Sequence, residues 1–260
     1  MNDSCLLEVK NLKKTYRQRG HIIKSVDDVS ICVDQKKTLG LVGESGSGKS
    51  TLAKLILRLE KPDEGEIFFQ GVDLLKLSRH EMMEIRKSLQ VIFQDPYGSL
   101  NPRMTALEII MEPLDIFLKN LSFQEKRSQV LNLMELVGLN PSFASRLPHE
   151  FSGGQRQRIA IARALSLNPR LIICDEPIAA LDVSIQSQII NLLKRLKEEL
   201  GINYLFISHD LAMVKYLCDD LAVMQMGRIV EQGCSEQIYK NPSHPYTKNL
   251  LDSIQRLAKI

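Results

Sequence analysis

The spacing of apolar and polar residues predicts strands at the start of the chain and a helix close behind them. Residues 5–33 alternate with a period near two, so the segments 6–12 and 26–33 are expected to be short strands. An unbroken apolar run at 39–42 predicts a buried strand, and the helical pattern at 49–59 ends before a proline and a glycine. This order of elements is typical of an α/β protein.

The middle of the chain loses the strand pattern. Residues 66–71 and 89–93 predict two more strands, with a charged helix at 78–89 between them. From residue 95 to residue 166 only helical periodicity is present. The expected helices lie at 105–118, at 123–139 and directly after 151–155. We interpret this stretch as a helical insertion within an α/β domain.

Strand patterns return in the last third. Apolar runs at 171–175 and 203–208 predict strands, and the amphipathic helix expected at 183–200 ends at Gly201. Residues 220–233 predict a hairpin, and a short helical tail follows.

These patterns divide the single domain into three parts. The expected α/β core comprises 1–94 and 167–234, the helical subdomain comprises 95–166, and the C-terminal tail comprises 235–260.

Composition narrows the class of protein. Apolar residues make up 44% and charged residues 25% of the 260 residues, which is ordinary for a globular protein. The net charge is only +3 and the basic residues are dispersed, so nucleic acid is not an expected partner. No apolar run approaches the ~18 residues that a membrane-spanning helix needs. The best candidate, 107–118, is interrupted by Glu112, Pro113 and Asp115.

The cysteines and the first residues bear on the compartment. The five cysteines are widely spaced, which argues against zinc, an iron–sulfur cluster or a disulfide framework and favours a reducing cytoplasm. Residues 1–12 lack the basic and apolar regions of a signal peptide.

One glycine-rich segment carries a specific nucleotide signature. Residues 43–50 fit G-x-x-x-x-G-K-[ST] at every position, between an apolar strand and a helix. Lys49 is expected to reach the β- and γ-phosphates, and the Ser50 hydroxyl to bind Mg²⁺. A chance glycine turn would lack this strand and helix. The predicted nucleotide-binding residues are Gly43, Glu44, Ser45, Gly46, Ser47, Gly48, Lys49, Ser50 and Thr51.

Polar residues at three strand ends complete a catalytic hypothesis. Asp175 and Glu176 follow the apolar run 171–174, where Asp175 would hold Mg²⁺ and Glu176 would polarise the attacking water. The alternative is a solvated strand end. Gln94 and His209 each follow a predicted strand. Gln94 would contact Mg²⁺ or the attacking water, and His209 would contact the γ-phosphate.

A second glycine site at 151–155 reads Phe-Ser-Gly-Gly-Gln and contains no lysine. With the phosphate loop, Gln94, the acidic pair and His209, it resembles the ATP-binding-cassette (ABC) ATPase family over nearly the whole chain. Members of that family pair head to tail, so that each ATP lies between one chain's phosphate loop and the other chain's signature. The resemblance therefore gives Ser152, Gly153, Gly154 and Gln155 to the partner's nucleotide.

The resemblance has further implications. It implies an ATPase that uses ATP and Mg²⁺, with a P-loop NTPase (RecA-like) core, an N-terminal antiparallel β subdomain and an inserted α-helical subdomain. It gives Tyr16 the role of stacking on adenine, whereas the residue pattern alone favours a strand surface residue, and it places Asp182 at the dimer interface. Two departures are present: Ile178 and Ala179 replace a Thr-Ser pair, and Phe151 replaces leucine.

Two segments, 93–105 and 241–254, look like the oligopeptide/dipeptide/nickel importer subgroup. The alternatives are a Pro-rich loop and a capping tail. The subgroup implies separate integral-membrane permease subunits, which would dock on the first segment, and a second ATPase subunit, identical or different. It also implies indirect work with a substrate-binding protein, from the cytoplasmic face of the inner membrane. The cargo, peptide or nickel, stays open. The printed sequence ends without the cysteine-containing extension of many subgroup members, so no cluster is expected there.

Other functions are weighed against this one. A GTPase would carry an N-K-x-D motif, which is absent, and a small-molecule kinase would not need the signature at 151–155. A DNA-repair ABC ATPase would carry a long coiled coil within the domain, and a translation ABC ATPase would carry two cassettes in one chain. Neither feature is present in the sequence, which disfavours both classes. A non-enzymatic nucleotide-binding module is disfavoured because Glu176 is intact.

Overall fold

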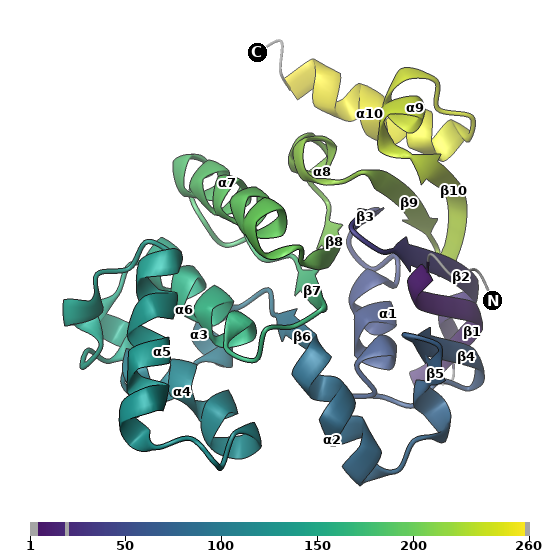
Figure 1. Ribbon diagram of the computed structural model, residues 1–260. Helices are drawn as coiled ribbons and strands as arrows, with labels where there is room; N and C mark the ends of the chain where they lie inside the picture. Colours follow the sequence, from purple (N-terminus) through teal and green to yellow (C-terminus); the bar gives the residue numbers. More distant parts are fainter. Residues whose placement is uncertain (1–4, 19–20, 258–260) are drawn as a thin grey trace. The chain divides into compact units, whose positions relative to one another are not determined.

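The computed structural model describes residues 5–18 and 21–257. It forms two compact units, shown among the ribbons of Figure 1. The first unit contains the chain up to Met82 and from Asn203 onward, and the second unit contains Met83–Ile202. The last three residues of the predicted tail lie outside the described residues. The predicted boundaries of core, helical subdomain and tail stay a prediction.

An antiparallel sheet in the first unit has the strand order β2-β1-β4-β5. Its strands are β1 (Cys5–Gln18), β2 (His21–Asp34), β4 (Glu64–Phe69) and β5 (Val72–Asp73). β1 and β2 are longer than predicted, because register shifts in their pairing interrupt the strict period of two. β5 was not predicted, because a strand of two residues has no periodicity.

The cysteine prediction was wrong at one point. Cys5 and Cys32 form a disulfide whose Cα atoms lie 6.0 Å apart. They are 27 residues apart in sequence, but β1 and β2 are antiparallel neighbours and Cys5 pairs with Asp34. Sequence spacing therefore hid the pair, and the inference of a reducing compartment loses the support it drew from that spacing.

The first unit also contributes four strands to a second sheet, in the order β10-β9-β3-β8. β3 (Thr38–Val42) lies parallel to both β8 (Asn203–Ser208) and β9 (Asp220–Gln225), and β10 (Arg228–Cys234) is antiparallel to β9. All residues of β3 and β8 are buried, as expected of parallel strands. The predicted hairpin turns at Met226 and Gly227, which both have positive φ.

The helices of the first unit depart from prediction mainly at their ends. α1 (Lys49–Ile56) ends three residues early, where Arg58 adopts a φ of 51°. α8 (Leu211–Leu217) and α9 (Ser235–Lys240) are too short to show clear periodicity and were not predicted. The predicted tail helix is α10 (Pro245–Leu257), and η1 (Leu74–Lys76) is a short 3₁₀ turn. The charged helix α2 (Arg79–Ser88) is where predicted.

The second unit combines two parallel strands, β6 (Leu89–Ile92) and β7 (Leu171–Asp175), with helices. All described elements between residues 95 and 166 are helical, as predicted. They are α3 (Pro96–Ser99), α4 (Ala106–Phe117), α5 (Phe123–Leu136), η2 (Pro141–Phe143), η3 (Pro148–Glu150) and α6 (Gly153–Leu165). Apolar residues of α4, α5 and α6 form their shared core, including Ile110, Val130 and Ile161.

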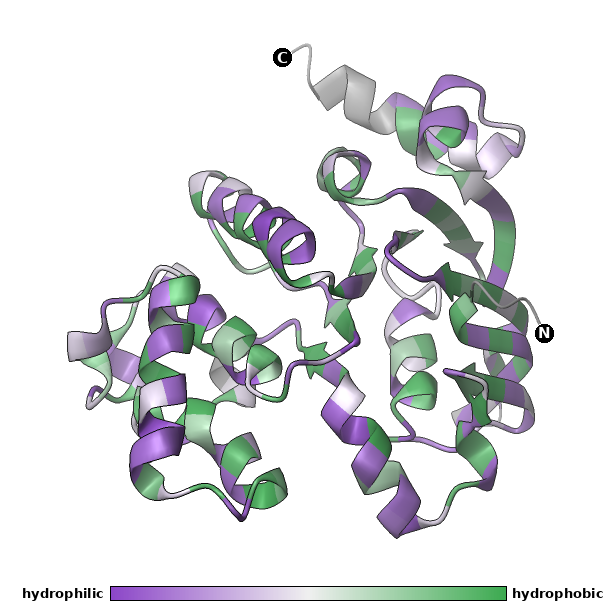
Figure 2. Cartoon of the chain, in the orientation of Figure 1, coloured by the Kyte–Doolittle hydropathy of each residue, from purple (hydrophilic) through white to green (hydrophobic). Residues whose placement is uncertain are grey.

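The last helix of the second unit is α7 (Val183–Leu200), whose alternating hydrophilic and hydrophobic residues are visible in Figure 2. It ends at Gly201 in the left-handed conformation, as predicted. Within the described part of the chain, no helix combines the length and hydropathy needed to cross a membrane.

Candidate nucleotide-hydrolysis site

The phosphate loop joins β3 to α1, as its sequence predicted. Gly43 and Gly48 both have positive φ, which L side chains rarely adopt. A Cβ atom on Gly43 would lie 2.1 Å from the Met224 carbonyl oxygen, and one on Gly48 would lie 2.0 Å from the Ser25 carbonyl oxygen. The loop is thus folded tightly against its own unit, and only glycine fits these two positions.

Lys49 is a buried cation held by its own loop. Only 4% of the residue is exposed, and its Nζ donates to the Gly43 and Glu44 carbonyl oxygens at 2.8 Å each. Nζ also lies 3.3 Å from Ser47 Oγ. These hydrogen bonds hold the ammonium group within the phosphate loop, where its positive charge is suited to binding phosphate oxygens.

The start of α1 is suited to phosphate as well. Its N-cap is Gly48, which has no side chain to cap the helix, and no acidic residue lies in the first turn. The first amides of a helix carry partial positive charge, so this end attracts an anion. The loop, Lys49 and the helix start together fit the triphosphate of ATP. The hydroxyl of Ser50, the next residue, is of a type that binds Mg²⁺.

Tyr16 lies on β1, with its hydroxyl hydrogen-bonded to the Glu60 carboxylate. Lys14 Nζ lies 5.6 Å from the centre of the Tyr16 ring. Burial and the hydrogen bond to Glu60 raise the pKa of Tyr16 to about 12, so the phenol stays protonated at neutral pH. The ring is therefore anchored by its hydroxyl, and its stacking on adenine stays a prediction.

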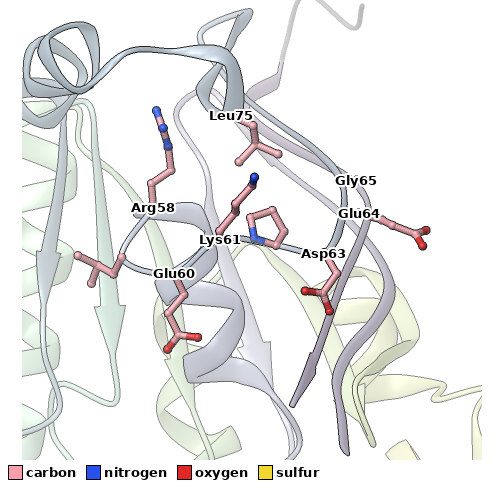
Figure 3. Close-up of a pocket in the computed structure, with 9 residues that line it drawn as sticks. Arg58, Glu60, Lys61, Asp63, Glu64, Gly65 and Leu75 are labelled. Atoms are coloured by element: carbon pink, nitrogen blue, oxygen red, sulfur yellow. The ribbon is translucent and has the colours of Figure 1, made fainter. Parts of the chain in front are cut away.

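A cavity of about 510 Å³ lies beside Glu60, the hydrogen-bond partner of Tyr16. It is lined by Leu75 and by residues 58–65, which include Glu60. Figure 3 shows the Arg58 and Lys61 side chains on one side of the loop and the carboxylates of Glu60 and Asp63 on the other. No phosphate-loop residue lines this cavity.

His209 directly follows β8 in an ordered turn. Ser208 Oγ accepts a hydrogen bond from the Asp210 amide at 2.9 Å, and Asp210 caps α8 by accepting from the Ala212 and Met213 amides. His209 itself is exposed. The turn thus presents an imidazole at the carboxyl end of a buried parallel strand, as predicted.

In the second unit, the structure brings Gln94 and Glu176 together. Gln94 Nε2 donates to Glu176 Oε2 at 3.0 Å. Gln94 follows β6 and Glu176 follows β7, which are parallel neighbours, so both side chains leave the same sheet edge. Asp175, the last residue of β7, is only 8% exposed. A nearly buried carboxylate at this edge fits a hard cation such as Mg²⁺.

Glu176 has a φ of 47°, which is uncommon outside glycine. Such a conformation costs about 1 kcal/mol or more and persists only where the surroundings hold it. Here it turns the chain immediately after β7. The Asp175 residue is therefore nearly buried, while the carboxylate of neighbouring Glu176 contacts Gln94. Strain at this position supports a functional carboxylate.

The signature residues form a helix cap. Ser152 Oγ accepts from the Gln155 amide at 3.3 Å, and Gln155 Oε1 accepts from the Ser152 amide at 2.9 Å. These two bonds make a capping box at the start of α6, which the sequence spacing S-x-x-Q permits. Since a hydroxyl both accepts and donates, Ser152 could still donate its proton to a phosphate.

The two signature glycines also allow close packing. A Cβ on Gly154 would lie 2.5 Å from Ile185 Cγ2, and one on Gly153 would lie 3.2 Å from Leu181 Cδ2. Both neighbours belong to the segment after Glu176. Asp182, in the same segment, is the exposed N-cap residue of α7, and its carbonyl oxygen accepts from the Ile185 amide. Its place at a dimer interface stays a prediction.

The predicted site residues thus fall into two sets. The phosphate loop, Tyr16 and His209 belong to the first unit, and Gln94, Asp175, Glu176, Asp182 and residues 152–155 belong to the second. Sequence reasoning missed Tyr246, whose hydroxyl accepts from the Glu44 amide at 3.0 Å across 202 residues. No local sequence pattern predicts a contact between residues so far apart in the chain.

Comparison with known proteins decides the family. Residues 26–179, more than half of the chain, match the family model described as ABC transporter. The chain belongs to the ABC transporter family. A second model, described as the C-terminal region of oligopeptide/dipeptide transporters, matches residues 230–259 of this ABC protein.

Curated relatives agree. The oligopeptide transport ATP-binding protein OppF of Bacillus subtilis is 52% identical over 250 residues, which cover 96% of this chain and 82% of that protein. The dipeptide transport ATP-binding protein DppF of Haemophilus influenzae is 48% identical over 259 residues, which cover 97% of this chain and 79% of that protein.

A solved structure has the same fold. It is a dimeric, post-hydrolysis state of the ATP-binding cassette MJ0796 bound to ADP and Pi. Its TM-score is 0.80 at 33% identity, over 88% of this chain and 98% of that one. The predicted family, its α/β fold and its ATPase class are therefore confirmed.

Proposed function

We propose that this ABC ATPase powers the import of oligopeptides or dipeptides through separate membrane subunits. The observation that carries the proposal is a phosphate loop with a buried lysine, and a Gln94–Glu176 pair, in a chain about half identical to peptide-transport ATP-binding proteins. The match of residues 230–259 to the peptide-transporter C-terminal region supports the same subgroup.

Each site residue has a proposed role. The loop residues from Gly43 to Thr51 hold the phosphates, with Lys49 on the β- and γ-phosphates. Ser50, Gln94 and Asp175 hold Mg²⁺, which neutralises phosphate charge when bound. Glu176 polarises the attacking water, and its bond to Gln94 at 3.0 Å fixes the carboxylate. His209 donates to the γ-phosphate, and Tyr16 stacks on adenine.

The proposal includes a dimer. Residues 152–155 of one chain would close on the ATP held by a second ATPase subunit, with Asp182 at the interface. Closure would then move the permease subunits that dock on the helical part of the chain, and a substrate-binding protein would deliver the peptide. The work would take place at the cytoplasmic face of the membrane. The division into an α/β core, a helical subdomain at 95–166 and a tail belongs to this proposal.

Purification of the native complex tests the proposal. A tagged copy expressed from its own locus should co-purify with membrane permeases and a peptide-binding protein, and vesicles of the complex should take up a labelled tripeptide only with ATP. Uptake of nickel without peptide would move the cargo to a metal. Recovery of the ATPase with nucleic acid and without any membrane protein would contradict a transport function.

A further inference from the structure

The tail of the chain touches the phosphate loop directly. The Tyr246 hydroxyl, in the first turn of α10, accepts a hydrogen bond from the Glu44 amide at 3.0 Å. Burial raises the pKa of Tyr246, so the hydroxyl is neutral at physiological pH and suited to a neutral backbone partner. Both residues belong to the first unit.

The peptide that Tyr246 contacts also holds Lys49. The Glu44 amide and the Gly43 carbonyl belong to the same peptide group, which is planar. That carbonyl oxygen accepts from Lys49 Nζ at 2.8 Å. Fixing the N–H end of a planar group fixes the direction of its oxygen as well. The hydrogen bond that the Glu44 amide donates to the tail therefore orients the carbonyl oxygen that positions the phosphate-binding ammonium.

The tail residue is itself held in place. Glu231 on β10 accepts from the Ser243 amide at 2.7 Å, from Ser243 Oγ at 2.8 Å and from the His244 amide at 3.0 Å. The Tyr246 amide then donates to His244 Nδ1 at 3.2 Å. Hydrogen bonds thus run from β10 through the start of α10 to the phosphate loop, and Figure 1 shows α10 beyond the end of β10.

We propose that Tyr246 is a positioning residue for Lys49: its hydroxyl fixes the Gly43–Glu44 peptide and so preorganises the phosphate loop for ATP. The proposal rests on nucleotide binding by this loop, and it is independent of the cargo and of the membrane partners. It assigns the tail of the ATPase a part in nucleotide affinity.

The test uses the purified full chain and ATP. Tyr246→Phe removes one hydroxyl and should weaken ATP binding by about 3- to 10-fold, measured by titration calorimetry. This range corresponds to the net free energy of one neutral hydrogen bond. Tyr239→Phe is the matched control, because the Tyr239 hydroxyl donates to the Leu211 carbonyl instead. It should leave the ATP dissociation constant unchanged.

Two further measurements separate positioning from general destabilisation. Hydrogen exchange at the Glu44 amide should accelerate in Tyr246→Phe and stay protected in Tyr239→Phe. Glu44→Pro removes the amide donor, so adding Tyr246→Phe to it should weaken ATP binding no further. Unchanged ATP affinity in Tyr246→Phe would overturn the proposal. So would an equal loss of ATP affinity when Tyr246→Phe is introduced into wild type and into Glu44→Pro. A wild-type chain that binds no ATP would instead refute the proposed function, while hydrogen exchange would still test the contact.

Discussion

The two glycine sites of this chain begin helices in opposite ways. At the phosphate loop the N-cap of α1 is Gly48, which offers no side chain, and a buried lysine lies beside it. At the signature the N-cap of α6 is Ser152, and a capping box with Gln155 already satisfies the first turn. The first site leaves its helix start to an external anion. The second is capped by its own side chains, residues 151–155 contain no cation, and the next residue, Arg156, donates to the Phe151 carbonyl oxygen at 2.6 Å.

This difference teaches why one chain needs both sites. The phosphate loop has the charge and the uncapped helix start needed to bind a triphosphate within one subunit. The signature can add hydrogen bonds to a phosphate that is already bound, but residues 151–155 have no lysine or arginine among them, and the adjacent Arg156 is hydrogen-bonded to the Phe151 carbonyl oxygen. That asymmetry supports the proposed arrangement, in which ATP binds first to the loop and a second subunit then closes over it.

The largest expected effect is at Lys49. Lys49→Ala removes the only cation that the loop sequence provides, and should lower ATP turnover by about 100-fold or more. ATP binding should weaken with it, as titration calorimetry would show. Lys240→Ala, which deletes an exposed lysine paired with Glu236, should change neither quantity. Normal ATP binding by Lys49→Ala would remove the contrast between the two glycine sites.

The next effect separates binding from chemistry. Glu176→Gln keeps the shape of the side chain but removes the carboxylate, so turnover should fall by about 100- to 10,000-fold while ATP stays bound. Bound nucleotide and dimer content, measured by light scattering with ATP, should both persist. Glu198→Gln, on the exposed face of α7, is the matched control. Turnover at the normal rate in Glu176→Gln would assign the water-activating role elsewhere.

How far the sequence predicted this molecule depends on the range of each interaction. The phosphate loop was predicted residue by residue, because strand, glycine turn and helix are contiguous and each needs a particular residue type. The Gln94–Glu176 pair was predicted only as two strand ends. Their hydrogen bond at 3.0 Å needed the parallel pairing of β6 and β7, which the sequence does not specify.

Interactions between distant segments could not be predicted. The Cys5–Cys32 disulfide depends on the register of β1 and β2, which register shifts make irregular. The Tyr246–Glu44 hydrogen bond joins residues 202 positions apart. Ser152 is a different case. The S-x-x-Q spacing of its capping box is present in the sequence, but the family motif at the same residues predicts only a contact with the partner's nucleotide.

A smaller effect would sharpen the comparison at the signature. Ser152→Ala removes the cap of α6 and should lower the free energy of unfolding by about 1 kcal/mol, measured by urea denaturation. Ser122→Ala removes the same kind of capping box from α5, where Ser122 Oγ accepts from the Glu125 amide at 3.3 Å, and should cost about as much.

The two variants should differ in activity. If Ser152 also donates to a partner's phosphate, only Ser152→Ala should lower turnover several-fold at saturating protein, where the dimer forms. Equal turnover in the two variants would reduce the signature serine to a helix cap.

The smallest expected effect concerns the tail that supports the phosphate loop. Burial opposes ionisation of Glu231, but the hydrogen bonds from Ser243 and His244 favour the carboxylate, and the pKa of Glu231 is lowered to about 2. The folded pKa lies below the ordinary value of 4.5, so this stabilisation is complete above about pH 4.5 and is lost as pH falls towards 2. Glu231→Gln should abolish that dependence.

Other carboxylates also lose stabilising hydrogen bonds in acid, so the informative quantity is a difference between proteins. The stability advantage of wild type over Glu231→Gln, from urea midpoints, should be largest at pH 6 and shrink by pH 3. Hydrogen exchange at residues 243–247 should accelerate over the same range in wild type. An advantage that is constant with pH would mean that Glu231 fixes the tail by shape alone, and the phosphate loop would then rest on a support that acid does not weaken.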